Sequence, residues 1–324
     1  MDLSTQYLGL TLKNPVIVAS CGLTHTLDQI IKADQAGAGA VVMKSLFEEQ
    51  IRQNDPSITE ATMHPEALDY IRAEIDMVHG PRDYLQTIRD AKKAISIPLI
   101  ASINCYSSKW WTSYASDIEA AGADALELNI YVEPFNYEKS SVELENIYLD
   151  ILHSVKMQIH IPVVLKLSPY FTSLANFAVK AEGQGANGLV LFNRFIQPEI
   201  DVNKMTTTVK GSFNDPVGFA YALRWVAILS ENIKADIAVS GGIKDADGMI
   251  KQLLAGASAI QIASVLYKKG LGKIQEMVDG LAEWMEKQEF SSIADFRGRL
   301  NQKNNPQSVS FSRAQYMKAI TNVD

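Results

Sequence analysis

Short apolar runs alternate with longer amphipathic stretches along most of this chain of 324 residues. Buried parallel strands typically read as short apolar runs, whereas helices that cover a sheet repeat their apolar positions about every 3.6 residues. The apolar runs predict strands at residues 15–19, 40–44, 98–103, 125–130, 163–167, 188–192, 236–240 and 259–262. The stretches between them predict helices near residues 27–36, 82–95, 112–121, 142–158, 172–184, 218–231 and 245–254, and an eighth from 271 towards 288.

Eight strands, each followed by a helix, are typical of the α/β class and of a (β/α)8 TIM barrel, a fold of about 250 residues. The additional length falls into an N-terminal hairpin, loops after the second, fourth and sixth strands, and a tail: residues 1–13, 45–80, 131–141, 194–216 and 289–324. The hairpin is predicted to turn at Gly9, and the tail to hold one short helix at 292–300. We therefore predict a TIM barrel with an N-terminal β-hairpin, long top-face loops and a short C-terminal helical tail.

Charge and composition limit the classes of partner. The 30 basic and 37 acidic residues give a net charge of −7, which argues against a broad nucleic-acid surface. The N-terminal sequence resembles no signal peptide, and no apolar run is long enough to span a bilayer. The two cysteines, Cys21 and Cys105, have no metal-site spacing, so no metal is expected. We expect a cytoplasmic protein of a single domain, 1–324, whose tail at 289–324 packs on the barrel or extends from it, with no nucleic-acid or membrane partner.

Small residues follow the last two predicted strands. The strand at 236–240 runs into Gly241 and Gly242, and the strand at 259–262 runs into Ala263 and Ser264. Neighbouring parallel strands that end in such loops bring several backbone N–H groups near one point, which suits a phosphate. The alternative is that the two glycines only make a tight turn from strand to helix.

Polar residues also end or interrupt other strands. Lys44 follows the second strand, and Lys166 lies within an apolar strand, where an unpaired charge would cost several kcal/mol to bury. Both lysines could bind a ligand, or they could pair with a barrel carboxylate such as Glu127. Asn129 and Asn193, at the ends of the fourth and sixth strands, could be hydrogen-bonded core amides. On facing strands, the two amides would instead suit hydrogen bonds to a planar heterocycle.

Seven segments, in order, resemble the soluble, FMN-dependent dihydroorotate dehydrogenase family. They are YLGLTLKNPVIVAS, GAGAVVMKS, IPLIASI, AGADALELNI, IPVVLKLSP, GANGLVLFNR and the pair SGGI with LLAGASAIQIASVLYKKG. LFNRF, ALRW and FRGRL are similar to a bacterial branch usually described as dihydroorotate dehydrogenase-like. The resemblance covers almost the whole chain and implies FMN in the mouth of the barrel.

The resemblance also implies roles for single residues. Ala19 and Ser20 would lie along the isoalloxazine ring, with Lys44 and Ser45 near its edge and the ribityl chain. Asn129 would contact the ring or the substrate. Lys166 would be catalytic, facing the N1/O2 edge of the flavin, where a cation stabilises the anionic reduced ring. Asn193 would bind substrate, and the 5′-phosphate would be held by Gly241, Gly242, Ala263 and Ser264.

The chain departs from the family after the fourth strand. Where soluble members read Asn-x-Ser-Cys-Pro-Asn, with the cysteine as general base, this chain reads NIYVEP, and Val132 takes the position of the base. Tyr131 is the first candidate for proton transfer, although a phenol with an ordinary pKa of about 10 suits an acid better than a base. The other candidates are Glu133, Cys105 and His64.

The residue after Asn193 also departs from the family, whose members carry Ser or Thr where this chain has Arg194. A guanidinium there could bind a substrate carboxylate through two parallel hydrogen bonds. It could equally pair with the nearby Glu199 or Asp201. The substrate-binding segment after the second strand is also replaced, by MHPE at 63–66.

Three functions agree with these observations. The first is an FMN oxidoreductase acting on a CH–CH bond of a small planar heterocycle, by default dihydroorotate to orotate in pyrimidine biosynthesis. The second is a flavin-free barrel aldolase or phosphosugar enzyme that forms a Schiff base through Lys166. The third is a catalytically silent flavoprotein scaffold. We choose the first and expect a homodimer, and the electron acceptor stays open between fumarate, a quinone, NAD through a partner subunit and another protein.

Overall fold

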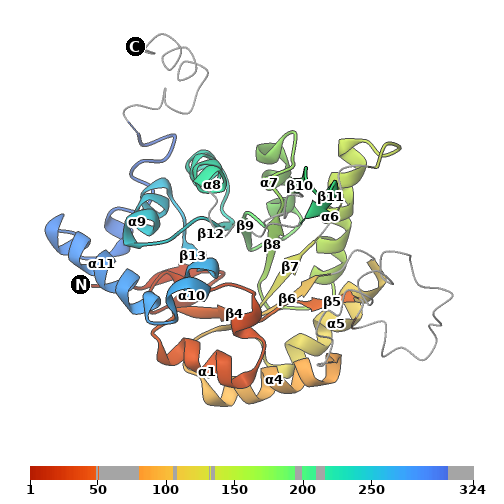
Figure 1. The fold of residues 1–324 in the computed structure, drawn as a ribbon, viewed down its shortest axis with the longest axis horizontal. Coiled ribbons are helices and arrows are strands. Elements are labelled where there is room, and N and C mark those ends of the chain that lie inside the picture. Colours follow the sequence, from red (N-terminus) through yellow and green to blue (C-terminus); the bar gives the residue numbers. More distant parts are fainter. Residues whose placement is uncertain are drawn as a thin grey trace, which may run out of the picture.

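Eight parallel strands close into a barrel, as the sequence predicts (Figure 1). The computed structural model describes residues 1–48, 50, 80–104, 108–130, 132, 136–193, 199–208 and 216–305. The barrel strands are β3 (Val16–Val18), β4 (Ala40–Val42), β6 (Leu99–Asn104), β7 (Ala125–Asn129), β8 (Val163–Leu167), β9 (Gly188–Leu191), β12 (Asp236–Ser240) and β13 (Ala259–Ile262). Their order is β4-β3-β13-β12-β9-β8-β7-β6, and a β4–β6 pairing closes the ring. A short strand, β5 (Leu46–Phe47), pairs with the end of β6.

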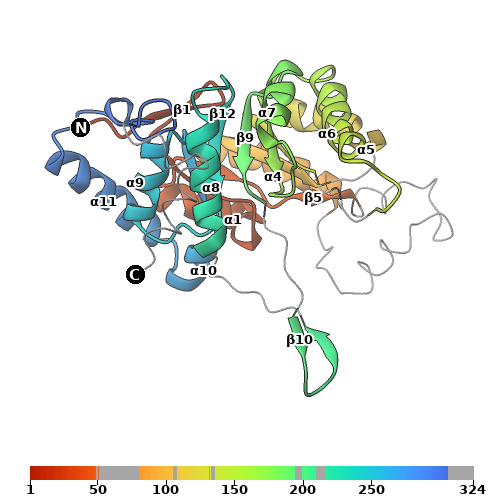
Figure 2. The ribbon, with the colours of Figure 1, turned by 90° about the horizontal axis from the view of Figure 1, so that it is seen from above.

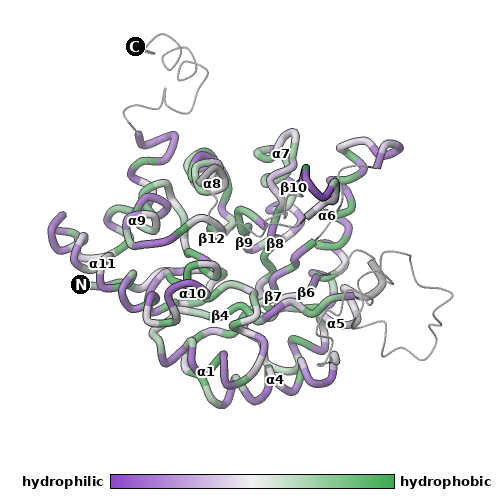
Figure 3. Tube along the Cα trace, in the orientation of Figure 1, coloured by the Kyte–Doolittle hydropathy of each residue, from purple (hydrophilic) through white to green (hydrophobic). Residues whose placement is uncertain are grey.

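Helices surround the strands, as the two perpendicular views show (Figures 1 and 2). They are α1 (Leu27–Gln35), α4 (Pro81–Ala94), α5 (Ser108–Ala121), α6 (Ser141–Lys156), α7 (Leu174–Gly183), α8 (Pro216–Leu229), α9 (Ala246–Ala255), α10 (Ser264–Lys269) and α11 (Lys273–Lys287). Figure 3 shows hydrophobic residues along the central strands and mixed colours along α1 and α4, as expected of helices with one face on the barrel. No helix within the described ranges has the length and apolarity needed to cross a bilayer.

Local signals explain several helix ends. The Thr26 side chain accepts a hydrogen bond from Gln29 N at the start of α1, and Ser140 and Glu143 form a capping box at the start of α6. Gly256, with φ +118°, ends α9 in the left-handed conformation. The sequence missed α10, which has only six residues and lies in a segment predicted as a loop. Gly270 (φ +78°) ends α10 and separates it from α11.

The N-terminal hairpin is confirmed, and it fills the barrel from its amino-terminal end. β1 (Thr5–Tyr7) pairs with β2 (Leu10–Leu12), with Leu8 and Gly9 both at positive φ, as a two-residue type I′ turn requires. Tyr7, Leu8 and Leu12 pack in one buried cluster with inward-facing strand residues, many of them small: Ile17, Ala40, Val42, Ile100, Ala125, Val164, Val190, Ala238 and Ala259. The larger core lies between the strands and the helices.

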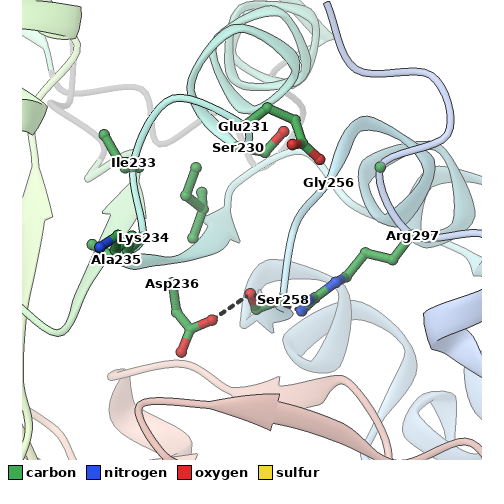
Figure 4. A pocket seen from close by; sticks show the side chains of 11 residues that line it. Ser230, Glu231, Ile233, Lys234, Ala235, Asp236, Gly256, Ser258 and Arg297 are labelled. Carbon is green, nitrogen blue, oxygen red and sulfur yellow. Dashed lines mark hydrogen bonds between the residues drawn. The ribbon is translucent and has the colours of Figure 1, made fainter. Parts of the chain in front are cut away.

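A polar cleft of about 170 Å³ marks the same amino-terminal end of the barrel (Figure 4). Asp236 accepts from Leu8 N at 2.8 Å and from the Ser258 hydroxyl at 2.8 Å. Arg297, from the tail, donates to the same hydroxyl at 3.1 Å. These bonds connect the hairpin, the start of β12 and the tail at the cleft. The Asp236 carboxylate and the Arg297 guanidinium are thus hydrogen-bonded to neighbouring groups of the chain.

The inserted segments and the tail differ from the prediction in detail. Within 194–216 the structure contains a hairpin of β10 (Glu199–Asp201) and β11 (Thr206–Thr208), which the sequence did not predict. In the tail, the predicted helix at 292–300 is a single 3-10 turn, Ile293–Asp295, followed by turns. Backbone bonds from Gly298 and Leu300 to α9 show that this part of the tail packs on the barrel. Most of the predicted insertion at 45–80 lies outside the described residues.

Leu12→Ala tests the role of the hairpin. Because Leu12 is fully buried inside the barrel, we expect the substitution to lower the free energy of unfolding by about 2–5 kcal/mol, as in other buried Leu-to-Ala changes. Urea denaturation measures the change. Thr11→Ala, on the exposed face of the same strand, should change that free energy by less than about 0.5 kcal/mol. Equal small effects of both variants would contradict a hairpin that fills the barrel.

Candidate active site

A buried charged network lies inside the carboxyl end of the barrel. The Lys166 ammonium, on β8, donates to Gln261 Oε1 at 3.2 Å and lies 3.4 Å from Glu127 Oε1. Gln261 Nε2 in turn donates to Glu127 Oε2 at 2.6 Å. Glu127 is 0% exposed, Gln261 1% and Lys166 6%. The network therefore joins β7, β8 and β13 in one interior layer.

Both predictions for Lys166 can hold at once. The lysine does pair with Glu127, as the alternative proposed. An ammonium has three donors, however, and the two described contacts use two of them. The third donor remains for an acceptor at the barrel mouth. The sequence missed Gln261, although a glutamine within the apolar strand AIQI is a signal of the same kind as Lys166.

Lys44 lies at the same end of the barrel but in a different environment. It directly follows Met43 at the end of β4, is half-buried, and its backbone N–H donates to Thr24 O at 3.1 Å. Across the described ranges, its ammonium forms no ion pair or hydrogen bond with a protein group. The predicted alternative, a pair with a carboxylate such as Glu127, is therefore not what these residues form. Lys44 is left as a cation beside the mouth.

Serine hydroxyls connect the ends of three neighbouring strands. Ser20 Oγ lies 3.0 Å from Ser45 Oγ and accepts from Ser45 N at 2.9 Å, and Ser45 Oγ lies 2.8 Å from Ser102 Oγ. Tyr84, on α4, donates to Ser102 O and accepts from Ser102 N. Burial raises the pKa of Tyr84, so this phenol stays neutral. Ser20 and Ser45 were predicted site residues, whereas Ser102 and Tyr84 were not.

The two predicted asparagines come together. Asn193 Nδ2 donates to Asn129 Oδ1 at 2.7 Å, although their strands, β7 and β9, are separated by β8. Asn129 is also in register with Lys166 on the adjacent strand, so both side chains point into the barrel. The alternative prediction, that the two asparagines are hydrogen-bonded core amides, is correct in part, since the amides hydrogen-bond each other. They do so at the rim of the charged network and not in apolar core.

The small-residue loops form an open cradle beside β12 and β13. Gly241 and Gly242 have φ values of +101° and +72°, which L side chains rarely adopt. A Cβ placed on Gly241 would meet no atom within 4 Å, so the space beside this loop is open. Ala19 N donates to Ile262 O at 2.9 Å, which places the end of β3 next to Ala263 and Ser264. The glycines are therefore required by the backbone, and the loop leaves room for a ligand.

The predicted acid–base region is described only at one residue. Val132 is half-buried and packs against the main core. Tyr131, Glu133, Arg194, Cys105 and His64 lie outside the described residues. Their predicted roles, including an Arg194 pair with Glu199 or Asp201, remain predictions. The residue that the sequence resemblance aligns with the family's base is therefore an aliphatic side chain packed on apolar core.

Cys21 follows the site residue Ser20 and is another group at the barrel mouth. Burial raises the pKa of its thiol, while hydrogen bonds, including one with Tyr267, and the charge of Lys166 lower it by less. The thiol is therefore protonated near neutral pH. Thiolate chemistry is not favoured at this position.

Comparison with known proteins identifies the family. The family model described as Dihydroorotate dehydrogenase matches residues 2–285. The chain belongs to the dihydroorotate dehydrogenase family. A dihydroorotate dehydrogenase B (NAD(+)), catalytic subunit, of Thermoplasma volcanium is 30% identical over 310 residues, covering 92% of this chain and 98% of the relative. The protein of the same name from Pyrococcus furiosus is 28% identical over 305 residues, again covering 92% and 98%.

Members of this family are FMN-dependent oxidoreductases that act on a CH–CH bond, and FMN is the cofactor of this chain. The geometry fits that cofactor. The space beside Gly241 is open, and Lys166 and Lys44 lie at the same end of the barrel as this loop. Cations there would stabilise the negative charge that a flavin gains when it accepts electrons. Within the described ranges no cluster of metal-ligating side chains is found.

Gly241→Ala tests the cradle. Since Gly241 is left-handed and its surroundings are open, the added methyl group acts on the backbone conformation, at a cost of roughly 1–2 kcal/mol. We expect FMN to bind about 5–30-fold more weakly, measured by titrating apoprotein with FMN fluorescence. Gly183→Ala, at the end of α7 with nothing within 4 Å, should leave FMN affinity unchanged. Unchanged affinity in Gly241→Ala would contradict a ligand held by this loop.

Proposed function

We propose that this protein oxidises dihydroorotate to orotate, in the cytoplasm and as a step of pyrimidine biosynthesis. The observation that carries the proposal is the buried Lys166, a residue 6% exposed. Its ammonium is held from below by Glu127 and Gln261, beside the Asn129–Asn193 pair. Oxidation of a CH–CH bond removes one proton and one hydride, and bound FMN supplies the hydride acceptor. Residues 1–324 are proposed to act as one domain.

The proposed FMN site uses three sides of the barrel mouth. The N–H groups of the cradle and of the β13 loop would hold the phosphate through Gly241, Gly242, Ala263 and Ser264. Ala19 and Ser20 would line the ring, and Ser45, held through Ser20 and Ser102, would face the ribityl chain. Lys44 would lie near the ring edge, supported by its lack of a protein partner among the described residues. Charged donors in a water-excluded site stabilise developing negative charge strongly.

The proposed substrate site lies above the asparagine pair. Asn129 and Asn193 would hydrogen-bond the planar heterocycle, since both side chains lie at the mouth and already fix each other's orientation. Arg194 would bind the substrate carboxylate through two parallel bonds. Proton transfer is assigned to Tyr131, because the neighbouring Val132 cannot accept a proton. The assignments of Tyr131 and Arg194 are the ones that depart from the family pattern.

The alternative functions are less well supported. A Schiff-base lysine needs an amine that is free to reach a carbonyl, whereas the Lys166 side chain is paired with the buried Glu127 and hydrogen-bonded to Gln261. The family membership also argues against a flavin-free aldolase. A silent flavoprotein scaffold would keep the cofactor site and lose the reaction, so flavin reduction decides between it and the enzyme.

Partners and electron acceptor are part of the proposal. NAD through a second subunit is the acceptor to test first, because the Thermoplasma and Pyrococcus relatives are named as NAD(+) catalytic subunits. Fumarate, a quinone and another protein are the other outcomes of that test. A homodimer is proposed, and its mass can be measured by light scattering.

The decisive experiment is anaerobic reduction of the bound flavin. We expect purified protein to be yellow and dihydroorotate to bleach its absorbance near the flavin maximum. A colourless protein that does not take up FMN would reject the flavoenzyme. Bleaching by another dihydro-heterocycle but not by dihydroorotate would keep the reaction class and reject the substrate. A yellow protein that no candidate substrate bleaches would favour the scaffold.

Lys166→Met tests the cation. Loss of a charge-stabilising donor typically slows a reaction by about 10²–10³-fold, so we expect stopped-flow flavin reduction to slow by that amount. FMN affinity should change by less than about tenfold, because the phosphate is held elsewhere. Lys180→Met, on the exposed face of α7, should behave as wild type. Wild-type reduction rates in Lys166→Met would remove this lysine from the mechanism.

Tyr131→Phe tests the proposed proton transfer. Loss of a general acid–base group typically costs about 10²–10⁴-fold, and we expect a decrease of that size in the rate of flavin reduction. Phenylalanine keeps the ring, so the dissociation constant of dihydroorotate should change little. A full reduction rate in Tyr131→Phe would transfer the role to Glu133, Cys105 or His64, whose substitutions then form the next series.

A further inference from the structure

Glu127 is a wholly buried carboxylate that lies against Lys166 and takes no part itself in the proposed binding or proton transfer. It lies on β7, one inward position below Asn129, and both of its oxygens are bonded within the barrel. Oε2 accepts the short bond from Gln261 Nε2 at 2.6 Å, and Oε1 lies 3.4 Å from Lys166 Nζ. The carboxylate is therefore hydrogen-bonded by a neutral amide through one oxygen and paired with the lysine at the barrel mouth through the other.

The amide and the carboxylate come from opposite walls of the barrel. In the strand order, β13 and β7 are separated by β12, β9 and β8 on one side and by β3, β4 and β6 on the other. Gln261 thus crosses the interior to reach Glu127, and Lys166 donates to both. Two of the three ammonium donors are fixed downwards, so the direction of the third is set by this pair.

Three titratable groups near the network, two phenols and one thiol, are neutral. Tyr7, in the hairpin below, has its pKa raised well above the ordinary value, first by burial and then by the Glu127 and Asp236 carboxylates. Burial also raises the pKa of Tyr84 and of Cys21. Glu127 is therefore the negative charge that lies directly against Lys166, beneath the barrel mouth.

We propose that Glu127 is a positioning residue which, together with Gln261, aims the Lys166 ammonium at the flavin and limits how strongly that ammonium favours reduced FMN. The inference rests on the proposed function, because it requires FMN above Lys166. An ammonium with no counter-ion would stabilise the anionic reduced flavin more strongly and would have one fewer fixed direction. The carboxylate thus lowers the stabilisation of the reduced flavin by Lys166, and in return it fixes the direction of the ammonium.

Glu127→Gln removes the charge and keeps the shape of the side chain. We expect the oxidised–reduced equilibrium of bound FMN to shift towards the reduced form by at least about tenfold, which is about 30 mV for a two-electron couple. The midpoint potential is measured by dye-coupled anaerobic titration. Asp236→Asn is the matched control, since it also removes one carboxylate but at the amino-terminal start of β12. Its potential should stay near that of wild type.

The double variant Glu127→Gln/Gln261→Glu provides a rescue. It exchanges amide and carboxylate within the same network, so one negative charge remains beside Lys166. We expect its midpoint potential to return to within about twofold in the equilibrium, or about 10 mV, of wild type. This variant also decides the case in which Glu127→Gln alone does not fold, because it retains the buried counter-ion.

The outcomes separate this inference from the proposed function. Failure of the wild-type protein to bind FMN rejects the function itself. FMN that binds, with a potential that falls in Lys166→Met but does not move in Glu127→Gln, overturns the inference and leaves the function standing. If the midpoint potential rises in Glu127→Gln and rises equally in Asp236→Asn, the change reflects net charge only, and this result also overturns the inference. If neither the single nor the double variant holds FMN, the network serves folding, and the positioning role is rejected.

Discussion

The structure depends on an ion pair that is removed from water inside the barrel. Burying a carboxylate and an ammonium costs several kcal/mol for each ion, and their attraction repays this only when the remaining polar atoms are also bonded. Glu127 and Lys166 meet that requirement through Gln261, which reaches them from the opposite wall. The pair is therefore satisfied only in a closed barrel, where β13 faces β7. The contact that completes the pair therefore depends on barrel closure, and it also fixes the position of the lysine.

The two ends of the barrel are filled in different ways. At the amino-terminal end, inward-facing alanines such as Ala125 and Ala259 leave room for Tyr7 and Leu12 of the hairpin, so the interior is packed with apolar side chains. At the carboxyl end, the inward positions carry Lys166, Asn129 and other polar groups. Apolar packing below excludes water from the ion pair, and polar groups above create a site that needs a polar ligand.

Sequence reasoning recovered the strands because burial on both faces leaves a local signal, an apolar run of fixed length. Lys166, Asn129 and Asn193 could be placed because polar residues at strand ends converge in a barrel. The contacts made by Gln261 could not be predicted, because they connect residues 95 and 134 positions apart across the interior. The β10–β11 hairpin was missed for a different reason: its strands are short and exposed, and carry no apolar alternation.

The sequence departs from its family at Val132, in the region proposed to act on the substrate and not in the region proposed to bind the cofactor. Backbone N–H groups at Gly241 and Gly242 can hold a phosphate whatever compound is oxidised, and a buried cation favours a reduced flavin in the same way. These features constrain the cofactor alone. In the proposed site, the compound that is oxidised would be selected by the groups that follow β7 and β9, where hydrogen bonds and proton transfer distinguish one heterocycle from another. Val132 packs on apolar core. At the position that the sequence resemblance gives to the family's base, it would change the chemistry required of its neighbours and leave the proposed flavin site unaffected.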